Sequence, residues 1–92
     1  MYTTSAKLTF HIPYSGSLKD KRQVCRSMLD KTRRKFNVSA AEVDTMDAHQ
    51  ILTIGIAVVS GSLTHANKSM DEVIRHIEGN TDAELVNVEL FD

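Results

Sequence analysis

Ile-Leu-Thr-Ile-Gly-Ile-Ala-Val-Val-Ser, residues 51–60, is the stretch that decides the fold. Its apolar side chains stand at odd and even positions alike. This pattern is typical of a strand inside a sheet that is covered on one face and at least partly covered on the other. Gly61 and Ser62 end the run. A central strand here requires partner strands from both sides of the sequence.

The residues before the central strand predict a hairpin. Residues 45–50 turn the chain, and residues 38–44 form a second, shorter strand that can pair antiparallel with the first. The alternation of polar and apolar residues is irregular around Ala40 and Ala41, where we expect a bulge.

The residues after the central strand predict a helix and a closing strand. Apolar residues recur at spacings of three and four up to Gly79, a residue that favours the position just past a helix end. These helical positions are Leu63, Ala66, Met70, Val73, Ile74 and Ile77. Apolar and polar side chains then alternate over residues 86–90, as in a strand with one buried face.

The N-terminal part of the chain repeats this order of strand and helix. Apolar and polar residues alternate over residues 6–12, and Pro13 stops the strand. Ser17 is placed to cap a helix, with Asp20 three residues later in a weaker form of the capping box. The helix then runs to about Phe36, and its apolar arc includes the single cysteine, Cys25.

The elements follow one another in the order β-α-β-β-α-β. Two helices of similar length and a central hairpin in this order predict an α+β, ferredoxin-like fold, with a four-stranded antiparallel sheet and both helices on one face. The other face should then be open. We expect the following residues there: Lys7, Thr9, His11, Thr53, Gly55 and Ala57, with Ile51 and Val59 near the strand ends.

Length and composition limit the possible architectures. A chain of 92 residues with 41% hydrophobic and 25% charged residues predicts a single globular domain over residues 1–92. No apolar run approaches the roughly 18 residues of a membrane helix, and the first residues do not follow a secretion-signal pattern. The lone Cys25 excludes an internal disulfide. We therefore expect a cytoplasmic protein that does not bind membranes.

Charge is distributed unevenly although the net charge is only −1. Residues 17–36 carry eight of the 11 basic residues and two of the 12 acidic ones, a local charge of +6 against −7 for the remainder. On a helical projection, a basic stripe lies beside the apolar arc. Its members are Lys19, Arg22, Arg26, Arg33 and Arg34.

The basic stripe predicts contact with phosphates, since arginine binds them in bidentate geometry. Structured RNA or a ribosomal particle is therefore a possible partner. We expect the helix to bind it, because the open face of the first strand and of the central strand offers no aromatic ring for base stacking. The alternatives are a merely solvated helix face, or neutralisation by acidic residues within the fold or across a subunit interface. A homodimer through the open sheet face or an edge strand also remains possible.

The turn before the first helix offers a second candidate for anion binding. Ser15, Gly16 and Ser17 precede the helix N-terminus, where free N–H groups and the helix dipole favour an anion. The alternative is an N-cap preceded by a turn glycine. The turn lacks the glycine and lysine spacing of a P-loop.

Candidates for catalysis are few. Asp47 and His49 in the hairpin turn have the chemistry of a metal or acid–base pair, which His11 could join if the turn folds over the sheet. Ordinary polar turn residues are the alternative. Cys25 in the apolar arc predicts a buried thiol rather than a nucleophile. We therefore expect a non-enzymatic protein with no catalytic residues, metal or cofactor.

Three blocks of sequence resemble a known family. His-Ile-Pro-Tyr-Ser-Gly-Ser-Leu-Lys-Asp-Lys-Arg (residues 11–22), Arg-Arg-Lys-Phe-Asn-Val-Ser-Ala-Ala-Glu-Val-Asp (33–44) and Ile-Gly-Ile-Ala-Val-Val-Ser (54–60) are similar to the signature blocks of the YlxP-like family, small bacterial proteins of unknown function. The resemblance implies a ferredoxin-like fold and no established activity. Family members are commonly encoded beside transcription-termination, translation-initiation and ribosome-maturation factors, which favours RNA or the ribosome as a partner.

The family's basic block falls on Lys19, Lys21 and Arg22, and a later block places Glu42 and Asp44 on the second strand. Family members often carry a tryptophan in the following hairpin, where this chain has residues 47–49 (Asp-Ala-His). Any contact that such a ring makes elsewhere is therefore not expected here.

Overall fold

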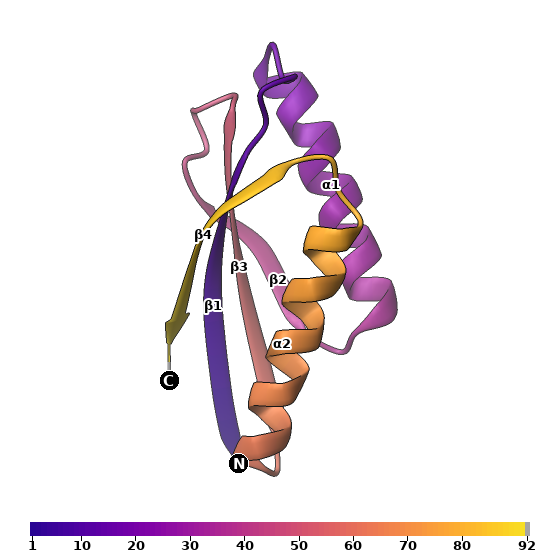
Figure 1. Cartoon of the computed structure of the whole chain (residues 1–92), viewed down its shortest axis with the longest axis vertical. Helices are drawn as coiled ribbons and strands as arrows, with labels where there is room; N and C mark the ends of the chain where they lie inside the picture. The colour runs from indigo at the N-terminus through magenta and orange to yellow at the C-terminus, as the bar shows by residue number, and fades with distance from the viewer. Residues whose placement is uncertain (92) are drawn as a thin grey trace.

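Four strands form one antiparallel sheet, and two helices cover one of its faces (Figure 1). The computed structural model describes residues 1–91. The elements are β1 (Tyr2–His11), α1 (Leu18–Lys35), β2 (Ser39–Asp44), β3 (Ile51–Ser60), α2 (Leu63–Gly79) and β4 (Glu84–Phe91). The strand order is β2-β3-β1-β4, so β2 and β4 are the edges. The predicted ferredoxin-like fold is confirmed.

The core lies between the sheet and the helices, because alternate residues of the two central strands point to the same face. Leu8 and Phe10 of β1 and Leu52 and Ile54 of β3 are completely buried there. Burying side chains of this size contributes about 1.5–3 kcal/mol each. The pattern around residues 51–60 therefore placed the central strand correctly.

Both helices begin at a serine cap and present a buried stripe to the sheet. Ser17 Oγ accepts a hydrogen bond from Asp20 N at 3.1 Å, and Ser62 Oγ accepts one from His65 N at 3.3 Å. The Asp20 carboxylate does not complete a capping box on Ser17, but accepts from Gly16 N at 3.0 Å. Neither helix has the length and hydropathy that crossing a membrane requires.

Several expected boundaries need correction. β1 starts at Tyr2 rather than at residue 6, because it pairs with β3 along its whole length, from Tyr2 opposite Ser60 to His11 opposite Ile51. β4 starts at Glu84, two residues earlier than expected. The irregular position in β2 lies between Glu42 and Asp44, not at residues 40–41.

Thr53 is also placed differently from the expectation. It shares the open face with Thr9, its partner across β1 and β3, yet only 3% of its surface is exposed. The reason is Thr45, whose hydroxyl lies 2.9 Å from the Thr53 hydroxyl where the chain leaves β2. The end of the hairpin thus covers one part of the face that the strand pattern left open.

Candidate nucleic-acid interface

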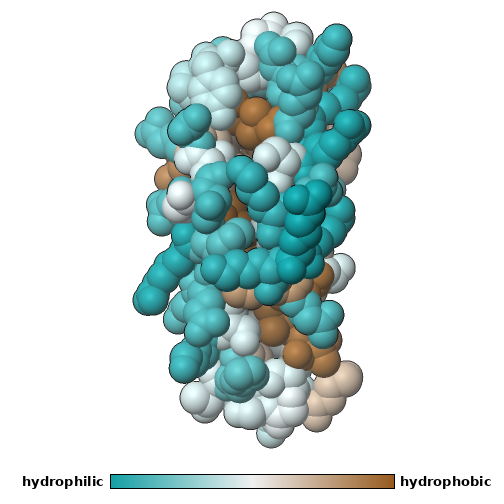
Figure 2. Space-filling view, turned by 90° about the vertical axis from the view of Figure 1, so that its right-hand side faces the viewer, coloured by the Kyte–Doolittle hydropathy of each residue, from teal (hydrophilic) through white to brown (hydrophobic). Residues whose placement is uncertain are grey.

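Five basic side chains lie exposed along one side of α1, and we call this surface the basic face. It consists of Lys19, Arg22, Arg26, Arg33 and Arg34. Within residues 1–91, none of the five forms an ion pair with a carboxylate. Figure 2 shows that the helix-bearing side of the molecule is largely hydrophilic, with only small hydrophobic patches. The predicted stripe is therefore accessible to solvent.

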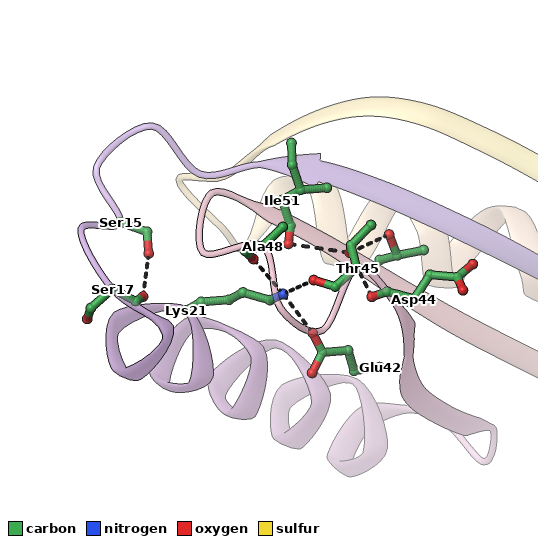
Figure 3. Close-up of polar contacts among 9 residues, drawn as sticks. Ser15, Ser17, Lys21, Glu42, Asp44, Thr45, Ala48 and Ile51 are labelled. Carbon is green, nitrogen blue, oxygen red and sulfur yellow. Dashed lines mark hydrogen bonds and ion pairs between the residues drawn. The ribbon is translucent and has the colours of Figure 1, made fainter.

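Lys21 of the same helix points the opposite way, into the protein. It is 2% exposed, and its Nζ lies 3.0 Å from Glu42 Oε2. The same Nζ donates to the carbonyl oxygens of Thr45 and Ala48, the latter at 2.8 Å (Figure 3). The buried ammonium group has two carbonyl acceptors and one carboxylate as counter-ion. Lys21 thus fastens α1 to the β2–β3 hairpin and cannot contact a partner.

Thr45, one of these acceptors, has a positive φ of 58°. A β-branched residue rarely adopts this left-handed conformation. Here its carbonyl accepts from both Lys21 Nζ and Ala48 N, and its hydroxyl donates to Asp44 O at 2.6 Å. These hydrogen bonds stabilise a turn that the backbone of threonine alone disfavours.

A groove of about 250 Å³ runs between α1 and β2 beside the basic face. Arg22, Arg26 and Arg33 line it together with Cys25 and Glu42. Arg33 Nη2 donates to the carbonyl oxygen of Ala40 at the start of β2. One arginine of the basic face is therefore held in place by the sheet, while the other two are free to adjust to a ligand.

Cys25 is buried, as its place in the apolar arc predicted. Burial raises the pKa of its thiol; the Glu42 carboxylate raises it further, while Lys21 and Arg33 act in the opposite direction. The thiolate is the reactive form of cysteine, so a raised pKa favours the unreactive thiol at neutral pH.

The turn before α1 uses its polar groups internally. Ser15 is 1% exposed, and its hydroxyl donates to Ser17 O at 3.1 Å. Gly16 N donates to the Asp20 carboxylate, and the Ser17 hydroxyl caps the helix. A negative carboxylate at the helix N-terminus repels a second anion. These contacts favour the N-cap interpretation over an anion site at Ser15, Gly16 and Ser17.

The candidate catalytic pair lies at the surface of the hairpin. Asp47 and His49 are exposed in the hairpin turn. The His11 ring is instead 3.9 Å from Glu84 of β4, measured from Nδ1 to Oε2. Within residues 1–91, no three His, Cys, Asp or Glu side chains are grouped as metal ligands.

Sequence reasoning missed the roles of Lys21 and Glu42. A signal was present, since Lys21 precedes the buried Cys25, Met28 and Thr32 by four, seven and eleven residues on the same helical stripe. Lysine is usually exposed in proteins, so the sequence alone predicted a surface position for Lys21. The acceptors of the Lys21 ammonium group come from the hairpin, and no pattern in α1 identifies them.

Comparison with known proteins gives a family and a fold. A family model described as "Protein of unknown function (DUF503)" matches residues 3–90. The uncharacterized protein YlxP of Bacillus subtilis (strain 168) is 39% identical over 64 residues, 70% of each chain. A de novo designed protein with a ferredoxin fold, known from a solution NMR structure, superimposes with a TM-score of 0.65 at 13% identity. That match covers 100% of this chain and 87% of the designed one, and it concerns the fold alone.

Proposed function

The chain belongs to the DUF503 family of proteins of unknown function, and from this premise we propose that it is a non-enzymatic binding module that holds structured RNA, free or within a ribosomal particle, through the basic face of α1. The observation that carries the proposal is the exposure of five cationic side chains that have no carboxylate partner within residues 1–91.

The arrangement of charge supports a phosphate-binding role. Four of the five residues are arginines, whose planar guanidinium groups bind phosphate oxygens in pairs. The basic face extends from residue 19 to residue 34, or about 22 Å along the helix axis. A row of this length can contact several phosphates of one RNA. The genomic context implied by the family resemblance agrees with such a partner.

The open face of the sheet supports the helix as the contact surface. Modules that read RNA on a sheet stack bases on aromatic rings of the central strands. Phe10 of β1 is completely buried in the core, and β3 contains no aromatic residue. Phe91 lines a groove on the open face, but it lies on the edge strand β4. The module we propose therefore recognises the phosphate backbone and shape of an RNA rather than its bases.

A charge-reversal experiment tests the proposal. The double variant Arg22→Glu, Arg26→Glu should lose binding to a structured RNA and co-sedimentation with ribosomal particles at low salt. With three to five phosphates engaged, log K should fall with log salt at a slope of about −2 to −4.5 for the unmodified chain. Losing two contacts should reduce that slope by about 1.4–1.8.

The matched control reverses Lys68 and Arg75, two exposed basic residues of α2, and so changes the net charge by the same amount. This control should keep most of the binding. Equal losses in both variants would mean that net charge alone governs the association. Unchanged binding by a folded Arg22→Glu, Arg26→Glu variant would contradict the proposal directly.

A further inference from the structure

The outer edge of β4 is a long strand edge with little protection. β4 runs over eight residues and pairs only with β1, so the backbone groups on its other side have no strand partner among residues 1–91. Natural edge strands are commonly protected by lysine or proline. The segment 84–91 contains neither residue.

Apolar side chains follow this edge. Val86, Val88 and Leu90 are 53%, 38% and 63% exposed. Val88 and Leu90 lie opposite Leu8 and Ala6 of β1, and so face the helix side of the sheet. α2 packs against β1 and β3, while β4 runs away from it (Figure 1). The helices thus leave the apolar row of β4 uncovered.

The opposite edge is protected. On β2, Arg33 donates to the Ala40 carbonyl, and the pairing with β3 is irregular between Glu42 and Asp44. A strand with a side chain bonded to its backbone is a poor template for another strand. The pairing of β4 with β1 is also irregular, at Val86, but within residues 1–91 no side chain bonds to the backbone of β4 between Glu84 and Leu90. Of the two edges, β4 is therefore the one suited to strand addition.

The open sheet face is a weaker candidate for self-association. A groove of about 330 Å³ there is mostly apolar, but the ion pair of Lys7 Nζ with Asp44 Oδ2, at 2.7 Å, lies on the same face. Covering this face would remove water from a charged pair that is now exposed, which carries a desolvation cost.

The sequence of β4 is self-complementary in one antiparallel register. With Val88 on a two-fold axis, Val88 lies opposite its own copy, Val86 opposite Leu90, and Asn87 opposite Glu89. Shifting the axis to residue 89 brings two Glu89 carboxylates together, and shifting it to residue 87 places Glu89 opposite Leu85. Opposed like charges destabilise a strand pair, whereas facing apolar side chains stabilise it. Glu89 also has a cation beside it, since Lys7 is its partner on β1.

We propose that the partner of β4 is a second copy of this chain, paired antiparallel about Val88 to give a continuous eight-stranded sheet. The contact is isologous, which means that both copies use the same edge. Pairing occupies that edge on both copies, so the assembly stops at a dimer. Both α2 helices lie near the axis and both α1 helices lie toward the outside. The basic faces stay exposed, so the dimer forms whether or not the chain binds RNA.

Sedimentation velocity over a concentration series without RNA tests the inference. The unmodified chain should reach twice its mass of 10.3 kDa as concentration rises. Val88→Lys should weaken the dimer at least tenfold, because the two introduced ammonium groups would lie opposite each other. Leu90→Lys, at a more exposed position, should weaken the dimer as well. It keeps the test valid if Val88→Lys does not fold. Circular dichroism establishes that both variants are folded.

Val59→Lys is the matched control, since Val59 is 63% exposed but lies on β3. It should leave the dimer intact. A mass of one chain at every concentration would overturn the inference. Dissociation by Val59→Lys but not by Val88→Lys would also overturn it, because it would locate the interface on the open face.

Disulfide formation tests the pairing register in a Cys25→Ala background. On oxidation, Val88→Cys should form a disulfide-linked dimer and Glu89→Cys should not. The reverse result would overturn the register.

Discussion

Lys21 lies on the buried stripe of α1, where the helical repeat predicts an apolar side chain. Taking that charge out of water is costly, and Glu42 together with two hairpin carbonyl groups offsets the cost. The arrangement is specific, because both carbonyl acceptors, Thr45 O and Ala48 O, belong to the turn that begins at Thr45. Lys21 therefore contributes to the geometry of the hairpin rather than to the charge of the surface.

Replacing Lys21 should destabilise the fold strongly. Lys21→Met leaves the Glu42 carboxylate without its cation and removes one donor from each of the Thr45 and Ala48 carbonyl groups, so the free energy of unfolding should fall by about 3 kcal/mol. Urea denaturation followed by circular dichroism measures the loss. Adding Glu42→Gln should recover part of it. Lys19→Met, an exposed neighbour, should change stability by less than about 0.5 kcal/mol, and an equal effect of the two lysine variants would refute the assigned role.

Individual residues were predictable where helical or strand period determines exposure. The basic face and the buried Cys25 follow from angles on one helix, which involve only local geometry. Thr53 and Lys21 were not predictable, because their burial depends on contacts made by the end of the hairpin, far away in the sequence. The period of β3 places Thr53 on the correct face but contains no information about what covers it.

At the scale of the elements, β2 and β3 approach closely on the open face. An ideal Cβ on Gly55 would lie 2.7 Å from Val43 Cγ1, closer than real carbon atoms come. Gly55 is therefore required by packing against the neighbouring strand and not by its own backbone angles. The period of the strands predicted that β2 and β3 pair, but it placed the irregular position of β2 two residues too early, because bulges depend on register between strands.

Gly55→Ala should be destabilising by about 1–3 kcal/mol, since overpacking forces side chains or backbone to shift. Thermal or urea unfolding measures this effect. The double variant Gly55→Ala, Val43→Ala removes the opposing methyl groups and should recover most of the stability. Gly61→Ala is the control, because nothing lies within 4 Å of a Cβ built there. A neutral Gly55→Ala variant would show that Val43 moves away without cost.

At the scale of the whole molecule, the elements share one core. β1 and β3 contribute to it from the middle of the sheet, and both helices pack onto the same face. The order of six elements was predictable from sequence because each is long enough to show its period. The uncovered apolar row of β4 was not predictable, because it becomes visible only once the positions of the helices are known.

A single core predicts a single unfolding transition for residues 1–92. Differential scanning calorimetry at low protein concentration should give one peak with an enthalpy of roughly 65 kcal/mol near 60 °C. The calorimetric and van't Hoff enthalpies should agree, as for other small domains. Two resolved peaks, or a calorimetric enthalpy well above the van't Hoff value, would contradict the assignment of one domain.

Residues 17–36 carry a local charge of +6 and the remainder of the chain −7, so charge is unevenly divided between α1 and the rest of the molecule. Such a protein behaves as a strong permanent dipole. In the electric field of a polyanion the net force on this protein is small, but a torque orients α1 toward the polyanion before contact. The chain should accordingly be retained on both cation- and anion-exchange resins near neutral pH, although its isoelectric point of about 6.4 suggests only the second.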